Sequence, residues 1–461
     1  MNTTFGYDLV LVMHQAGSTV LDGAAYTYDA AGNRTAKSAL PANATYTYSY
    51  DPIYELTQAL QTSTGKATEK YTYDPVGNRL SQPGVPYTYN SSNEMLTREG
   101  VPYTYDANGS TLSKTNGSGT TSYTWDYENR LTSLTVPGTG TVSFAYDPFG
   151  RRIENVSPSG TTIYVYDGGN IIEELNANGT LGERYTYGPR TDEPLVGQRQ
   201  PKIFYYEADG LGSVTSLTDP TGAVAATYTY DSFGFMTAST GSATNWFRYT
   251  ARQFDSDTAL YYYRARYYDP VAGRFLSEDP LGFAADMDFY RYVGNDPEDF
   301  TDPFGLRDIY VLLWYPQNGS VGHAMSTELN GATINSQWPN TSGYWAQNDT
   351  LNLADTLGRE SRPPDYTYIV HVPDDGPFNV TAANQRSAPW WVAFPHGTKQ
   401  TNCVNAVAKA LNSGGVPVAN GYSSPADLGD RLAQLSLQKP KPGQTWSVSS
   451  TSFSNVPGVK H

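Results

Sequence analysis

The chain has 461 residues, which exceeds one ordinary domain and suffices to bury a large core. Its formal net charge of −15 lies entirely in residues 1–306, because residues 307–461 hold 10 basic and 10 acidic side chains. Neither part has the basic excess that collects phosphates, so the sequence disfavours a nucleic-acid partner. The single cysteine, Cys403, excludes a disulfide scaffold and a multi-thiolate zinc site within one chain.

The first residues show no basic segment followed by an apolar segment, so no signal peptide is visible. Met1 enters within a repeat, and we therefore expect the chain to be a fragment of a longer gene product. No stretch approaches the roughly 20 apolar residues that a membrane-spanning helix needs.

Residues 1–245 repeat one short unit, in which two aromatic residues separated by one position precede Asp or Asn and a turn. Most of these Asp or Asn positions are 16–23 residues apart, the size of a β-hairpin. Aromatic residues two positions apart share one face of a strand, and Asp with Gly or Asn favours a tight turn. One hairpin cannot bury its aromatic face, so the units must stack into a continuous sheet. The repeats end at Asp29, Asp51, Asp74, Asn90, Asp106, Asp126, Asp147, Asp167 and Asp231.

This unit resembles the YD repeats of the Rhs and Tc-toxin family over nearly all of residues 20–306. The resemblance implies a mainly β fold, a spiral of hairpins that forms a hollow shell around a toxic C-terminal domain. The alternative is a β-solenoid with an adhesive surface. In both cases the repeat tyrosines are core residues, without a catalytic role.

Residues 246–306 carry a different pattern, which includes Leu260–Pro270, Gly273–Gly282 and Tyr290–Pro297 and ends in Asp302-Pro-Phe-Gly-Leu306. The pattern resembles the Rhs core-associated module. That resemblance implies a self-cleaving aspartyl protease that cuts after the last Asp-Pro-x-Gly-Leu, here between Leu306 and Arg307.

The two Asp-Pro-x-Gly copies make Asp279 and Asp302 the candidate catalytic carboxylates. Hydrolysis without a metal needs one ionised carboxylate to activate water and one protonated carboxyl group, and two carboxylates that share a site separate in this way. The alternative is that both residues only cap turns before proline. Arg274 would tune the pair or neutralise nearby acids, and Asp296 and Asp299 are reserve candidates.

The composition changes at residue 307, where the repeat ends and tyrosine becomes rare. The apolar run Ile309–Trp314 and the alternating segment Tyr366–Val372 predict strands, and Val321–Leu329 with Ala332–Trp338 predict a hairpin. Residues 403–411 and 425–435 predict helices. We expect residues 307–461 to form an α+β effector domain.

Cys403 is placed in the first turn of the predicted helix, where the helix dipole favours the nucleophilic thiolate. The alternative is an inert small core residue. A nucleophilic thiol needs a base. Only the terminal His461 follows Cys403, so the base must come from His323, His371 or His396.

The order Gly-His-Ala, Asn-Gly, Trp-Pro and Asn-Cys over residues 308–415 resembles circularly permuted papain-fold hydrolases, including NlpC-type amidases and the lecithin:retinol acyltransferase group. The resemblance implies Cys403 as nucleophile, His323 as base and Asn335 as the residue that orients the imidazole. A two-residue turn at Asn330-Gly331 would place Ser336 on the face of His323 instead, and a three-residue loop would place Asn335 there.

These expectations combine into a toxin whose shell releases, by self-cleavage, a thiol hydrolase or acyltransferase acting on amide or ester bonds in a competitor cell. Peptidoglycan, protein and lipid are the alternative substrates, and we expect no cofactor and no metal. The family implies a cognate immunity protein, secretion or delivery machinery and a secreted or surface-delivered location. The alternatives are an adhesive surface protein with a passive C-terminal cap and a toxin of another chemistry.

Overall fold

The structure is a computed structural model that describes residues 10–29, 32–41, 44–62, 69–189, 191–280 and 288–306. Beyond these it describes the strands named below, together with Leu428, Arg431 and Leu432. The chain divides into two compact units. The first comprises residues 1–29, 33–279 and 287–305, and the second comprises residues 30–32, 280–286 and 306–461.

The Asp of each repeat builds the turn that follows its strand. The Asp74 carboxylate accepts hydrogen bonds from the backbone N–H groups of Val76 and Asn78, each at 3.0 Å. Gly77, with φ of 93°, closes the turn by donating to the Asp74 carbonyl at 3.0 Å. Other repeats have the same arrangement, in which the side-chain oxygen of Asp or Asn accepts hydrogen bonds from the backbone N–H groups two and four positions later. It recurs at Asp51, Asn90, Asp106, Asp126, Asp147, Asp209, Asp219 and Asp231.

The two aromatic residues of a repeat make different contacts. The first is buried, as Tyr123 is at 4% exposure. The second is half-buried, and its hydroxyl donates to the backbone carbonyl of the first residue of the preceding strand, as from Tyr89 to Arg79 at 2.8 Å. Each repeat is thereby tied to the one before it. The same bond recurs in the pairs Tyr105–Met95, Tyr146–Leu131, Tyr166–Arg152 and Tyr230–Val214.

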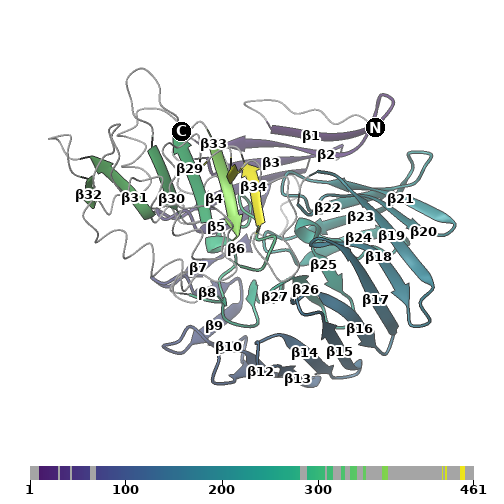
Figure 1. Ribbon diagram of the computed structural model, residues 1–461, viewed down its shortest axis with the longest axis horizontal. Coiled ribbons are helices and arrows are strands. Elements are labelled where there is room, and N and C mark those ends of the chain that lie inside the picture. Colours follow the sequence, from purple (N-terminus) through teal and green to yellow (C-terminus); the bar gives the residue numbers. More distant parts are fainter. Residues whose placement is uncertain are drawn as a thin grey trace, which may run out of the picture. The chain divides into compact units, whose positions relative to one another are not determined.

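The hairpins pair in chain order to form the wall of the first unit (Figure 1). An antiparallel sheet contains β1 (Val10–Ala16), β2 (Thr19–Tyr28), β3 (Arg34–Leu40), β4 (Ala44–Tyr50), β5 (Leu56–Gln61) and β6 (Glu69–Lys70). The following strands form a closed barrel: β7 (Thr72–Tyr73), β8 (Arg79–Gln82), β9 (Val85–Tyr89), β10 (Met95–Arg98), β11 (Val101–Tyr105), β12 (Thr111–Asn116), β13 (Gly119–Trp125), β14 (Leu131–Val136), β15 (Gly140–Tyr146), β16 (Arg152–Ser157), β17 (Gly160–Asp167), β18 (Asn170–Asn176), β19 (Leu181–Tyr187), β20 (Pro194–Arg199), β21 (Lys202–Ala208), β22 (Val214–Thr218), β23 (Val224–Tyr230) and β24 (Met236–Gly241). The expected mainly β fold is confirmed.

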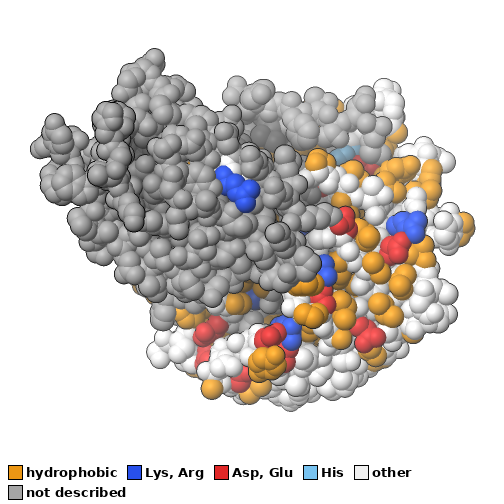
Figure 2. Space-filling model, viewed as in Figure 1, with side chains coloured by type: hydrophobic (Ala, Val, Ile, Leu, Met, Phe, Trp, Pro, Cys, Tyr) orange, Lys and Arg blue, Asp and Glu red, His pale blue; other side chains and the backbone are white. Residues whose placement is uncertain are grey.

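The face of the strands opposite the buried tyrosines carries few charges. Hydroxyl pairs bridge neighbouring strands on it, as between Thr88 and Thr97 at 2.7 Å and between Thr104 and Ser113 at 2.7 Å. Figure 2 shows hydrophobic and uncharged side chains over most of the described surface on this side of the molecule, with charged groups scattered among them. Alternation between a buried aromatic face and an uncharged outer face is typical of strands that line a single-layered wall.

Residues 246–306, called the module below, follow the repeats. They contain a small sheet that packs against the aromatic face of the repeats. It contains β25 (Gln253–Asp255), β26 (Leu260–Tyr263), β27 (Arg266–Asp269) and β28 (Arg274–Phe275), and short 3-10 turns lie at Tyr249–Ala251 and Val293–Asn295. Leu260, Tyr262, Tyr267 and Leu276 of this module share one hydrophobic cluster with repeat residues that include Tyr123 and Phe144.

A buried ion pair links the module to the barrel. Arg152, which is fully buried, places Nη1 2.5 Å from Asp255 Oδ2, and its Nη2 donates to Gln253 at 2.6 Å. The guanidinium also lies 4.4 Å from the centre of the Tyr262 ring. Because the buried guanidinium is paired with a carboxylate and stacked on an aromatic ring, it fixes the position of β25 against β16.

The second unit contains one antiparallel sheet in the order β32-β31-β30-β29-β33-β34. Four of its strands lie where the sequence predicts them, namely β29 (Ile309–Trp314), β30 (His323–Thr327), β31 (Thr333–Pro339) and β33 (Tyr366–His371). The sequence did not predict the two edge strands, β32 (Ala346–Asn348) and β34 (Ser447–Thr451). Leu428, Arg431 and Leu432, within the helix predicted over 425–435, are helical, and both leucines are buried. The helix predicted over 403–411 lies outside the described residues.

Candidate autocleavage site

The two candidate carboxylates meet at one guanidinium group. Arg266 is the first residue of β27 and is almost completely buried. Its Nη2 lies 2.8 Å from Asp279 Oδ2 and 3.4 Å from Asp302 Oδ2. Both aspartates are buried as well. The fold therefore brings together two acidic residues that are 23 positions apart in the sequence.

The same arginine also holds the backbone just before Leu306. Arg266 Nε donates to the Gly305 carbonyl at 2.5 Å, and its Nη1 donates to the Phe289 carbonyl at 3.0 Å. The guanidinium lies 3.6 Å from the centre of the Phe275 ring, which shields it from solvent. A single side chain thus connects the two carboxylates to the backbone of Gly305, next to the expected cleavage site.

Neighbouring residues hold the rest of this segment. The backbone N–H of Ala265 donates to the Phe304 carbonyl at 3.1 Å, and Arg264 Nη1 donates to the Pro303 carbonyl. The Arg264 guanidinium also lies 5.1 Å from the centre of the Phe304 ring. The turn between β26 and β27 therefore anchors residues 303–305 through both backbone and side-chain contacts.

Gly305 is required at its position for a steric reason. Its φ of 66° lies in the left-handed region. A Cβ atom there would overlap the Tyr263 carbonyl oxygen and lie 3.0 Å from the backbone nitrogen of Arg266. A larger residue would therefore push the segment away from Arg266.

The reserve candidates Asp296 and Asp299 form a separate pair that binds the start of β3. Asp299 accepts hydrogen bonds from the Arg34 backbone N–H at 2.9 Å and from the Tyr50 hydroxyl at 3.2 Å. Burial raises the pKa of Asp299 to about 6, and burial together with the neighbouring Asp299 raises the pKa of Asp296 well above its ordinary value. These contacts join the module to the N-terminal sheet.

Arg274, which the sequence offered as a tuning residue, neutralises another acid. Its Nη2 lies 3.7 Å from Asp288 Oδ1 and donates to the Asn93 carbonyl at 2.7 Å. Sequence reasoning missed Arg266. The available signal was its charge between two runs of tyrosine, Tyr261–Tyr263 and Tyr267–Tyr268, since an arginine buried among aromatic residues needs carboxylate or carbonyl partners.

The effector candidates are only partly described. His323 begins β30, and the pairing of β30 with β31 places Ser336 opposite Met325 and Asn335 opposite Ser326. Alternate positions of a strand share a face, so positions 323 and 336 lie on the same face of this sheet.

Several predicted residues lie outside the described part of the chain, namely Arg307, His396 and Cys403. His371 is the last residue of β33. Within the described residues, no group of three His, Cys, Asp or Glu side chains has the arrangement of a metal site, and no helix is long and apolar enough to cross a membrane.

Comparisons with known proteins identify several relatives. The tRNA nuclease WapA of Bacillus subtilis is 33% identical over 251 residues, which make up 51% of this chain and 11% of that protein. The double-stranded DNA deaminase toxin A of Burkholderia cenocepacia is 28% identical over 183 residues, 38% of this chain and 12% of that protein. The chain therefore spans only a small part of the length of these relatives.

The crystal structure of TcdB2-TccC3 has a similar fold, with a TM-score of 0.53 and 22% identity over 65% of this chain and 18% of that one. The family model of the teneurin YD-shell matches residues 26–298. This matched segment contains most of the hairpin wall and the small sheet packed against it. The chain is thus a member of the teneurin YD-shell family.

Proposed function

We propose that this chain is part of a polymorphic toxin that cleaves itself between Leu306 and Arg307 and so frees residues 307–461 from the YD shell. The observation that carries the proposal is the joint contact of Arg266 with Asp279, Asp302 and the Gly305 carbonyl. The toxins among the relatives support the general role.

In the proposed reaction, one carboxylate removes a proton from water as the water oxygen attacks the carbonyl carbon of Leu306. The other carboxyl group donates its proton to the amide nitrogen of Arg307 as the C–N bond breaks. The products are a carboxyl group on Leu306 and an amino group on Arg307. Arg266 supplies one positive charge for two carboxylates. When one of the two carboxylates binds a proton, the three side chains together are neutral, and the pair has the one ionised and one protonated carboxyl group that hydrolysis requires.

The purified full chain tests this step by intact-mass measurement and sequencing of the new N-terminus. We expect wild-type protein to yield a fragment that begins at Arg307. Asp279→Asn and Asp302→Asn should each slow cleavage at least ~100-fold, because each removes one proton-transfer group. Asp257→Asn, at a half-buried position that accepts a hydrogen bond from Ser159, is the matched control and should cleave normally. Cleavage at the normal rate in both dyad variants would refute the mechanism.

For the released domain we propose a thiol hydrolase or acyltransferase with Cys403 as nucleophile and His323 as base, acting on amide or ester bonds in a competitor cell. The strand register around His323 favours Ser336 over Asn335 as the orienting residue. A second candidate is an effector that acts on nucleic acid, since one relative is named a tRNA nuclease and another a DNA deaminase toxin. An immunity protein, delivery machinery and a secreted or delivered location belong to the same proposal.

Growth of cells that produce the full chain separates the two candidates. Under the thiol mechanism Cys403→Ser should abolish growth inhibition, with damage to peptidoglycan, protein or lipid in the wild type alone. Asn402→Ser is the neighbouring control. Undiminished toxicity of Cys403→Ser, with degraded tRNA or deaminated DNA, would instead establish the nucleic-acid effector.

A further inference from the structure

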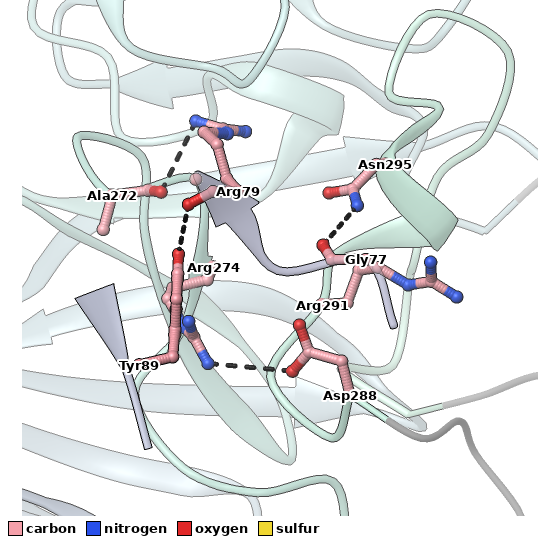
Figure 3. Close-up of a pocket in the computed structure, with 9 residues that line it drawn as sticks. Gly77, Arg79, Tyr89, Ala272, Arg274, Asp288, Arg291 and Asn295 are labelled. Atoms are coloured by element: carbon pink, nitrogen blue, oxygen red, sulfur yellow. Dashed lines mark hydrogen bonds and ion pairs between the residues drawn. The ribbon is translucent and has the colours of Figure 1, made fainter. Parts of the chain in front are cut away.

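A small cavity lies where β8 meets the module, and Figure 3 shows the residues that line it. Its volume is about 10 Å³, close to the smallest space that holds a single water. Three arginines from different segments line it, namely Arg79 of β8, Arg274 of β28 and Arg291. Asp288 is the carboxylate in the wall. The remaining wall is formed by Gly77, Tyr89, Ala272, Gly273 and Asn295.

Arg79 is buried and forms no ion pair with a described carboxylate, although the Asp231 carboxyl group interacts with it electrostatically. It is only 6% exposed, and its closest acceptor is the Ala272 carbonyl, 3.5 Å from Nη1. Its Nε and Nη2 have no hydrogen-bond partner, and no described carboxylate forms an ion pair with it. Its guanidinium is stacked 3.8 Å from the centre of the Phe233 ring. Aromatic faces attract a cation, but they leave its N–H donors in the ring plane unsatisfied.

The other two arginines, Arg274 and Arg291, each already contact an acidic side chain. Arg274 donates to the Asn93 carbonyl and approaches Asp288, yet its Nε has no partner. Arg291 places Nη1 3.2 Å from Glu55, which is not part of the cavity wall. The wall therefore carries three positive charges against one negative charge. The side-chain groups of Arg79 and Arg274 that lack a hydrogen-bond partner are all N–H donors.

We propose that this cavity binds a monatomic anion, chloride under ordinary conditions. An anion accepts from every N–H donor that faces it and balances a buried positive charge, whereas a water must also place two protons of its own. A monatomic anion is the smallest kind of anion, so it suits this small volume better than sulfate, phosphate or a carboxylate. A bound anion would join β8 to the segments around Arg274 and Arg291, so it would stabilise the docking of the module on the barrel.

Thermal unfolding of the full chain in sodium chloride and in sodium gluconate at equal ionic strength tests the proposal. We expect 100 mM chloride to raise the Tm of the wild type by at least about 2 °C over gluconate, because a ligand that binds only the folded state stabilises it. Arg79→Gln should abolish this difference. Arg130→Gln, which removes a guanidinium at a surface turn, should retain it.

Crystals grown in bromide give a second reading that needs no variant, since bromide scatters anomalously. An anomalous peak between Arg79 and Arg274 is expected. Equal Tm values in chloride and gluconate, with a water and no anomalous peak in the cavity, would overturn the proposal. A peak without any effect on Tm would identify an adventitious ion only and would also reject it. The cleavage reaction does not enter either measurement.

Discussion

At the level of single residues, Arg266 determines how the end of the module is arranged. Its three nitrogens contact the carboxylates of Asp279 and Asp302 and the carbonyls of Gly305 and Phe289. Under the proposed function it is a positioning residue, because it acts through the acids and the backbone that it holds. The contact to Gly305 is the shortest link between the acids and the scissile segment, and it can be tested separately from them.

Gly305→Ala should reduce self-cleavage at least ~10-fold while Asp279 and Asp302 remain intact, because a displacement of about 1 Å from productive geometry is costly. The added methyl group would overlap the Tyr263 carbonyl oxygen and move the segment. Gly138→Ala is the control, since Gly138 also has a positive φ, of 79°, but has open space around it. The fraction of cleaved chain over time is the measurement, and equal rates in the two variants would contradict the steric account.

The two acids could be proposed from the sequence, but the choice of Arg266 as their shared partner could not. Asp279 and Asp302 stand in two copies of one short motif, and the resemblance points to both. The partner of the pair depends on how β27 lies beside residues 302–305, which no local spacing encodes. The same limit applied to Asn335 and Ser336, whose faces depend on the register of β30 with β31.

At the level of elements, most repeats are joined to their neighbour by a hydroxyl-to-carbonyl bond. The carbonyl belongs to the first residue of the preceding strand. At this residue the pairing between the two strands shifts register, as it does opposite Thr124 and Trp125, and one backbone hydrogen bond between the strands is lost. The hairpins and their turns could be predicted from the repeated Asp and the aromatic pair. The hydroxyl bond could not, because the sequence predicted only that both aromatic residues share one face of the strand and gave no sign of the shift in register.

Tyr146→Phe should lower the free energy of unfolding by about 1–3 kcal/mol, because the Leu131 carbonyl loses its donor in a partly buried site. The same hydroxyl lies 3.1 Å from that of Tyr267 in the module, which adds to the effect. Tyr127→Phe, at a position 88% exposed, should be neutral. Urea unfolding gives both values, and an unchanged midpoint for Tyr146→Phe would show that the bond contributes nothing.

At the scale of the whole first unit, many acidic side chains are buried in the wall and under the module. Burial raises the pKa of Glu174 to about 8, and burial with the nearby Glu69 raises that of Asp231 to about 8. Burial also raises the pKa of Glu55 to about 7. These groups hold their protons in the folded state at pH values where the unfolded chain has lost them, so they favour folding less as the pH rises from about 4 to about 8.

The Tm of the full chain should therefore fall as the pH is raised from 5 to 8.5. Asp192 and Asp269, whose pKa values are lowered by nearby arginines and by Lys114 against the effect of burial, stay ionised throughout this range and do not oppose the trend. Glu174→Gln should flatten the slope, because it removes a buried group that must ionise. Glu128→Gln, at a surface turn, should leave it unchanged. A Tm that rises over this range would contradict the assignment.

The closure of β7–β24 into a ring has a consequence for behaviour at high concentration. A strand at the rim of an open sheet offers unpaired N–H and C=O groups to any neighbouring chain, which is how soluble β-proteins begin to aggregate. The strands from β8 to β23 are each paired on both sides, so they expose no such template. Opening the ring at one hairpin would create two rims at once, and such a variant should precipitate long before it loses its secondary structure.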